Sequence, residues 1–211
     1  MLSSNDKALW CPGIPGAGKT VFTFYVVVHL KHIFAKSEVG IGYIYCNYKD
    51  PDQTADNWIA SLLRQLLQSR PAVPIDLVGI YNKHIRENTR PSFKEFLGLL
   101  RTSARSFSKT FIVIDALDEC RGQDCTRSRL LAALQDVRPY IHLVVTSRWS
   151  QAIEYQFEDA LRLESRASDK DIESFVKSRI ATKTKLRRHV EADTTLKKLI
   201  IDKIVERCHG P

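Results

Sequence analysis

The sequence predicts an α/β fold: a three-layer α/β/α sandwich around a mostly parallel five-stranded sheet, with additional helices at its C-terminal end. Two observations lead to this prediction. Continuous apolar runs of strand length, such as 110–115 and 141–146, are typical of strands that are buried on both faces of a parallel sheet. Segments with helical periodicity separate these runs, and alternating strands and helices give right-handed crossovers between parallel strands.

The first half of the chain is expected to contain two strands and four helices. Residues 39–46 are rich in β-branched and aromatic side chains, which favours a strand. In the segment 54–69, apolar side chains from Trp58 to Leu67 repeat along one helical face, and Pro71 follows as a stop signal. In chain order we expect a strand at 7–11, a helix at 18–35, a strand at 39–46, and helices at 54–69, 75–88 and 92–106.

The second half continues the alternation and then becomes helical. We expect a strand at 110–115, a helix at 126–137, a strand at 141–146 and a short fifth strand at 161–163. Ser168 is expected to cap the next helix, which has Asp171 in its first turn, and a last helix is expected at 194–208. We therefore divide the chain into a core at 1–165 and a helical extension at 166–211.

A complete phosphate-binding motif, G-x-x-x-x-G-K-[ST], follows the first predicted strand and opens the first helix. Its residues are Gly13, Ile14, Pro15, Gly16, Ala17, Gly18, Lys19 and Thr20. Glycines let successive N–H groups point at phosphate oxygens, and the helix adds its positive N-terminal end. Lys19 would reach the β- and γ-phosphates, and the Thr20 hydroxyl would hold Mg²⁺. The motif predicts binding of a nucleotide, with ATP or ADP and Mg²⁺ as the cofactors.

Acidic residues follow the buried strand at 110–115. Asp115 ends this strand, which is the position of a Walker B carboxylate that supports the metal ion. Asp118 and Glu119 come three and four residues later, and one of them could orient or deprotonate the attacking water. Alternatively, Asp118 and Glu119 cap the turn that follows the strand.

Arg148 leaves the tip of the strand at 141–146, next to the predicted phosphate site. Its positive charge could sense the γ-phosphate and stabilise the negative charge that spreads over the transition state. A plain surface arginine is the alternative interpretation of this residue.

The net charge of +8 is concentrated near the C-terminus, because residues 177–207 contain ten Lys or Arg against four Asp or Glu. A basic segment can bind nucleic acid. No aromatic residue that could stack on a base follows Phe175, however, so we interpret the segment as a solvated helical face and do not expect a nucleic-acid partner.

The composition favours a cytoplasmic protein. The N-terminal residues 1–6 lack the features of a signal peptide, and no apolar run has the roughly 20 residues that a membrane helix needs. The five cysteines are an odd number and widely scattered, as expected for reduced thiols in the cytosol.

With these motifs in view, the chain resembles the NACHT-domain NTPases of the STAND class, which are P-loop proteins, and most closely the fungal NLR-like proteins of vegetative incompatibility. The resembling segments are 9–20, 43–49, 111–120 and 144–148. A small residue after the Walker B Asp, here Ala116, followed by an acid pair is typical of NACHT domains. Many AAA+ and helicase-like proteins place Glu at that position.

The resemblance implies a regulated switch that holds ADP, exchanges it for ATP, hydrolyses ATP slowly and forms a homo-oligomer on activation. It implies the sheet order 5-1-4-3-2, with the 141–146 strand between the first strand and the 110–115 strand. It also implies an N-terminal effector domain, a winged-helix lid and repeat regions in a longer protein, so we expect low autonomous ATPase activity. Adenine follows from the class, because no guanine-reading motif is present.

Two other functions compete with this switch. The chain could be a nucleotide-binding interaction module without meaningful turnover, because P-loop switches often need a closing element or an arginine from a neighbour. A nucleic-acid-dependent ATPase is a further alternative, which the basic segment favours and the absence of helicase motifs disfavours.

Overall fold

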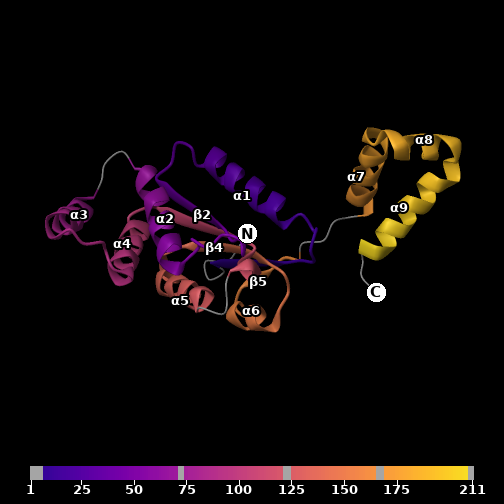
Figure 1. Cartoon of the computed structure of the whole chain (residues 1–211). Coiled ribbons are helices and arrows are strands. Elements are labelled where there is room, and N and C mark those ends of the chain that lie inside the picture. The colour runs from indigo at the N-terminus through magenta and orange to yellow at the C-terminus, as the bar shows by residue number, and fades with distance from the viewer. Residues whose placement is uncertain (1–6, 71–73, 121–124, 165–168, 209–211) are drawn as a thin grey trace. The chain divides into compact units, whose positions relative to one another are not determined.

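The computed structural model describes residues 7–70, 74–120, 125–164 and 169–208. The chain divides into two compact units, Met1–Ser165 and Arg166–Pro211 (Figure 1). Within the described residues, none of the helices combines the length and the apolar character that crossing a membrane requires.

The first unit is built on a sheet whose described strand pairs are all parallel. Its strands are β1 (Ala8–Pro12), β2 (Val39–Tyr45), β3 (Lys109–Asp115), β4 (His142–Ser147) and β5 (Leu161–Arg162), and their order is β2-β3-β4-β1-β5. This order is 5-1-4-3-2 seen from the other side, so the prediction is confirmed. Because the strands are parallel, the carboxyl ends of β1, β3 and β4 meet at one edge of the sheet.

Helices cover both faces of this sheet (Figure 1). On one face lies α1, where Lys31 sits over the ring of Tyr43 in β2 at 4.6 Å and Phe34 stacks on Phe111 of β3 at 5.5 Å. On the other face α2 approaches β2 closely, because a Cβ at Gly42 would lie 2.9 Å from the side chain of Leu62. The helices of the unit are α1 (Lys19–Ile33), α2 (Ala55–Gln68), α3 (Ile75–Glu87), α4 (Phe93–Arg105), α5 (Thr126–Val137) and α6 (Gln151–Gln156), with short 3-10 turns η1 (Leu117–Glu119) and η2 (Arg138–Tyr140).

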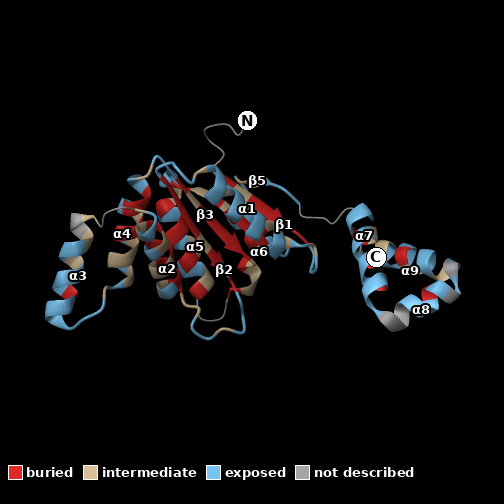
Figure 2. Cartoon of the chain, turned by 90° about the horizontal axis from the view of Figure 1, so that it is seen from above, coloured by how far each residue is buried: buried red, intermediate tan, exposed pale blue. Residues whose placement is uncertain are grey.

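The core follows the central strands, as the buried residues in Figure 2 show. In β3, Ile112, Val113 and Ile114 have no exposed surface, so this strand is covered on both faces. On α2, Ile59 and Leu62 are equally buried. Full burial of such a side chain stabilises the fold by about 1.5–3 kcal/mol, so the strand that ends in Asp115 is firmly held.

Two glutamine side chains close the free edge of β2, the outermost strand on its side of the sheet. Gln65 accepts from the Tyr43 N–H (3.0 Å) and donates to the Tyr43 carbonyl (2.9 Å). Gln53 donates to the Tyr45 carbonyl (3.1 Å) and accepts from the Asn47 N–H (2.7 Å). An open strand edge is a template for pairing with another chain, and these amides take the place of a neighbouring strand.

The described residues of the second unit form three helices, α7 (Asp169–Thr182), α8 (Thr184–Ala192) and α9 (Thr194–Cys208). Its core is small and consists of aliphatic side chains from all three helices: Ile172, Val176, Ile180, Val190 and Ile201. The predicted cap Ser168 lies outside the described residues.

Most predicted elements are present, with bounds shifted by one or two residues, but the two helices α6 and α8 were not predicted. The helix α6 has only six residues, and its cap is Ser150, whose hydroxyl accepts from the Ile153 N–H. The helix α8 is rich in charged residues, and Val190 is its buried contact among the side chains that the structure describes. Neither helix has the repeated apolar stripe on which a periodicity argument depends.

Candidate functional site

The loop between β1 and α1 presents unpartnered amide groups beside a helix N-terminus. Gly16 and Gly18 have φ values of 81° and 78°, a region that glycine enters without strain. No acceptor among the described residues takes their N–H groups, and a Cβ built on either would meet nothing within 4 Å. The helix α1 begins directly afterwards, at Lys19, so its N-terminal end faces the same space. Such a concave set of N–H groups attracts anions.

The Lys19 side chain folds back over this loop. Its Nζ donates to the carbonyl oxygens of Gly13 (2.7 Å) and Ile14 (2.8 Å). Burial lowers the pKa of the Lys19 ammonium from its usual value, and the nearby Asp118 carboxylate acts in the opposite direction. The ammonium is therefore held at the loop by carbonyl groups, which an incoming anion could replace.

Asp115 is the centre of a buried hydrogen-bond network at the end of β3. Only 2% of the residue is exposed. Thr20 donates to its Oδ2 at 2.6 Å, while Thr23 and Thr146 donate to its Oδ1 at 2.9 and 2.6 Å. Three hydroxyl donors compensate for taking this carboxylate out of water. The network joins the phosphate loop, α1, β3 and β4 at one point.

A sharp turn after β3 brings the acid pair back toward the site. Ala116 has φ 52°, a left-handed conformation that is unusual for a residue other than glycine, and η1 begins directly after it. Asp118 then accepts from the Arg148 N–H at 2.7 Å and pairs with the Arg148 Nε at 3.2 Å. Glu119 lies 3.9 Å from the Arg148 guanidinium. In this structure, therefore, Arg148 engages both acids that were predicted to act on water.

The strand ends are tied together beneath the loop. The Gly13 N–H donates to the Ser147 carbonyl at 3.0 Å, and the Trp10 indole donates to the Ser147 hydroxyl at 2.8 Å. Cys46 lies close by, because its N–H donates to the Asp115 carbonyl. Burial strongly raises the pKa of the Cys46 thiol, which makes it an inert apolar group rather than a nucleophile.

The structure brings the predicted site residues together at this edge. The loop Gly13–Thr20, Asp115, the acid pair and Arg148 all belong to it. Two contributors were missed, the hydroxyl groups of Thr23 and Thr146. The signal for Thr23 was its place one helical turn after Thr20 in an otherwise apolar run, where a hydroxyl needs a partner.

A comparison with known families identifies the chain. Residues 1–148 of the 211 match the family model described as "Nephrocystin 3, N-terminal". The chain belongs to this family. The matched range contains every residue of the network around Asp115, so the nephrocystin 3 N-terminal family covers the whole candidate site.

Solved structures resemble this member of the nephrocystin 3 N-terminal family in fold. ORC2 of Aeropyrum pernix, in ADPNP–ADP complexes, is 14% identical with a TM-score of 0.53 over 82% of this chain and 45% of its own. ORC1 of the same organism, in complex with DNA, is 16% identical with a TM-score of 0.52 over 83% and 44%. The chain thus spans less than half the length of these proteins. No curated protein matches the chain in sequence.

These similarities show the P-loop NTPase fold and confirm the fold class. They do not support the expectation that nucleic acid is an unlikely partner, because one of the similar structures was solved with DNA. The identities are too low to transfer an activity from those proteins to this chain.

Proposed function

We propose that the first unit binds ATP and ADP with Mg²⁺ and is the core of a NACHT-type switch, which signals through its conformation. The observation that carries this proposal is the 2.6 Å hydrogen bond between Thr20 Oγ1 and Asp115 Oδ2. It joins the last residue of a phosphate loop to a buried strand-end carboxylate that lies 95 residues away in the sequence. A chance glycine-rich turn would have no reason to meet such a carboxylate.

The loop would hold the phosphates. The free N–H groups of Gly16 and Gly18 and the start of α1 supply hydrogen-bond donors. Lys19 would exchange its two carbonyl partners for β- and γ-phosphate oxygens, a stronger, charge-assisted interaction.

The residues present fit Mg²⁺. The Thr20 hydroxyl and the Asp115 carboxylate are oxygen ligands of the kind that this ion prefers, and they already lie side by side. Bound Mg²⁺ would neutralise phosphate charge. Thr23 and Thr146 would keep the Asp115 carboxylate oriented, because both donate to its Oδ1 and leave Oδ2 facing Thr20.

Arg148 would couple nucleotide sensing to hydrolysis. It pairs with Asp118 and lies near Glu119, and a γ-phosphate would compete for the same guanidinium. If the Arg148 guanidinium moved from the acids to the γ-phosphate, one of the two acids would be free to orient or deprotonate water. The need to break this ion pair first is one physical reason to expect slow turnover.

The same ion pair favours a second candidate, a nucleotide-binding module without turnover. In that case Arg148 would hold Asp118 and Glu119 permanently, and the pair would only stiffen the turn after β3. Both candidates share the phosphate site and differ only in what the acids do.

Three further expectations belong to the proposal. The second unit would begin a lid region of a longer protein, and activation would involve a homo-oligomer. The location would be cytoplasmic, to which the free thiols of Cys11, Cys46 and Cys125 are suited.

Calorimetric titration of ATP and ADP with Mg²⁺ tests the nucleotide site. We expect Lys19→Ala to abolish measurable binding. Lys31→Ala is the matched control, because Lys31 lies on the same helix but contacts Tyr43 rather than the loop. Wild-type affinity in Lys19→Ala, or equal loss in both variants, would refute the site.

Turnover separates the two candidates. For the switch, Asp118→Asn or Glu119→Gln should spare nucleotide binding and slow phosphate release about 100-fold or more, the range typical of losing a general base. Absence of turnover in a wild-type chain that binds ATP would favour the module, and equal loss of binding and turnover would make the acids structural.

A further inference from the structure

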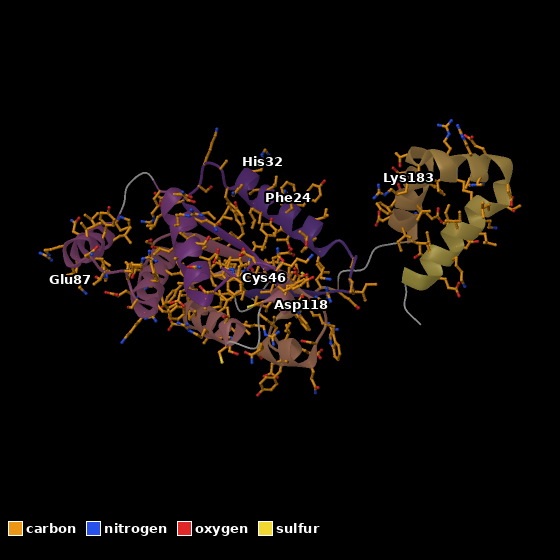
Figure 3. The ribbon with its side chains drawn as sticks, in the orientation of Figure 1. Phe24, His32, Cys46, Glu87, Asp118 and Lys183 are labelled. Carbon is orange, nitrogen blue, oxygen red and sulfur yellow. The ribbon has the colours of Figure 1, made fainter. Side chains whose placement is uncertain are left out.

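A cavity of ≈ 700 Å³ lies between α2, α3 and α4. Its walls are formed by Leu63 and Leu67 of α2, Leu77 and Ile80 of α3, and Phe96 of α4. None of its lining residues belongs to the network around Asp115. Figure 3 shows the separation, since Glu87 at the end of α3 lies at the opposite end of the first unit from Asp118. The volume falls within the ~300–1,000 Å³ of ligand pockets.

The lining is apolar with a single charge. All of its residues have side chains without polar atoms except Arg64, Gln68 and Tyr81. Of the lining residues that the structure describes, Arg64 is the only charged one. A long apolar surface with one cation at its margin matches a ligand that has an apolar body and an anionic end.

Arg64 has no partner of its own among the described residues, since it takes part in none of their ion pairs or hydrogen bonds. Other arginines of the first unit do have intramolecular partners. Arg129 pairs with Asp56 at 3.0 Å, and Arg101 pairs with Asp136. The Arg70 guanidinium lies over the ring of Phe107 at 4.4 Å. A guanidinium that is free of intramolecular partners is suited to a carboxylate, which it can bind with two parallel hydrogen bonds.

We propose that this cavity binds a long-chain carboxylate, with its alkyl chain between α2, α3 and α4 and its carboxylate on Arg64. Burial of each methylene is worth about fourfold in affinity. The helix α3 packs on the core through Leu77 and Ile80, which also line the cavity. Binding at this site does not depend on nucleotide.

Dodecanoate, used below its micelle concentration, is the test ligand, and calorimetry on the full chain is the measurement. We expect binding that tightens about fourfold per added methylene from octanoate to dodecanoate. Dodecanol should bind at least tenfold more weakly, because it cannot form a charged pair with Arg64. Dodecanol binding as tightly as dodecanoate would overturn the proposal.

Two substitutions test the role of Arg64. Arg64→Gln should weaken dodecanoate binding about tenfold and leave dodecanol binding unchanged. Arg86→Gln is the matched control, since Arg86 is an exposed arginine of α3 outside the lining. Equal weakening by both variants would show that only the net charge attracts the anion, and the site would be rejected.

Filling the cavity tests its position. Ala60 lines the cavity from α2, and Ala60→Phe should abolish dodecanoate binding while circular dichroism and the melting temperature stay close to wild type. Retained binding would contradict the assignment. The chain could instead fail to bind dodecanoate and form a dimer that Val78→Asp dissociates. This face would then be a contact between two copies of the chain, and the proposal would be wrong.

Discussion

The two units of the chain differ in what they bury. The buried polar residues that the structure describes all lie in the first unit, and four of these eight, Thr23, Asp115, Thr146 and Ser147, meet where β3 and β4 end. The second unit, among its described residues, buries only Ile172, Val176, Ile180, Val190 and Ile201. Among its described residues, ion pairs form between neighbours on one helix at the surface, as between Lys177 and Glu173.

This difference indicates where chemistry is possible. A buried carboxylate is costly unless hydrogen bonds compensate for the lost water, and the first unit supplies three donors to Asp115. An aliphatic core holds helices together without placing any reactive group. We therefore place the proposed nucleotide site in the first unit.

The largest effect is expected from Asp115→Ala. It would leave three hydroxyl groups and a buried space without their partner, and we expect the free energy of unfolding of the first unit to fall by about 3 kcal/mol. Trp10, Trp58 and Trp149 all lie in this unit, so urea unfolding followed by tryptophan fluorescence reports on it.

Asp193→Ala is the matched change in the second unit. Asp193 directly precedes α9, and its Oδ1 accepts hydrogen bonds from the hydroxyl and the N–H of Thr195 in the first turn of that helix. Losing such a cap costs about 1 kcal/mol. Thermal unfolding followed by circular dichroism would measure this loss of stability. A loss as large as that of Asp115→Ala would break the contrast between the units.

The sequence predicted the parts that depend on continuous patterns. The apolar run at 110–115 predicted a strand that is buried on both faces, and β3 is such a strand. The glycines of the segment Gly13–Thr20 predicted a curled loop, and Gly16 and Gly18 have the positive φ values of such a loop. The position of Asp115 followed from the end of β3. The strand order came from the family resemblance rather than from any property of the strands.

Features that depend on contacts between distant segments could not be read in the same way. Gln53 and Gln65 bond the free edge of β2, but nothing in the sequence marks them, because their role depends on the position of β2 in the fold. The pairing of Arg148 with Asp118 needs the left-handed turn at Ala116, for which the sequence gives no signal. The cavity beside α3 is likewise a product of packing.

The second unit should unfold first, since its core is small for an independent domain. We expect circular dichroism to show an early thermal transition that tryptophan fluorescence does not report. Ile180→Ala should lower the stability of this unit by about 2 kcal/mol and leave the fluorescence transition and nucleotide affinity unchanged. A single transition, shifted equally for both probes, would show that the two units unfold together.

The sheet edge gives a smaller difference, because only the first unit has strands among the described residues. Gln65→Ala removes both hydrogen bonds to the backbone of Tyr43. We expect a loss of about 1–2 kcal/mol and concentration-dependent self-association in light scattering. Gln68→Ala, on the same helix, is the control. If both variants stay monomeric, Gln65 does not protect the edge.

The smallest expected effect is a loss of stability at acid pH, which both units should show. Hydrogen bonds from the Ser92 N–H and hydroxyl, followed by His84, lower the pKa of Glu95 from 4.5 to about 2. A carboxyl with a lowered pKa stabilises the fold above its unfolded pKa, and this contribution disappears as pH falls from about 4.5 toward 2. Hydrogen bonds from Thr195 lower the pKa of Asp193 in the second unit too.

The stability difference between wild type and Glu95→Gln should therefore shrink between pH 6 and pH 3, as urea unfolding at the two values would measure. A difference that stays constant with pH would contradict the interactions assigned to this carboxyl.

The most direct test of the account compares two threonines that share one carboxylate. Thr20 and Thr23 both donate to Asp115, but only Thr20 belongs to the phosphate loop. The measurement is the calorimetric affinity for ATP with and without Mg²⁺. We predict that Thr20→Val removes the strengthening by Mg²⁺, whereas Thr23→Val keeps it. Equal behaviour of the two variants, or full Mg²⁺ dependence in Thr20→Val, would contradict a metal–nucleotide site at this edge of the sheet.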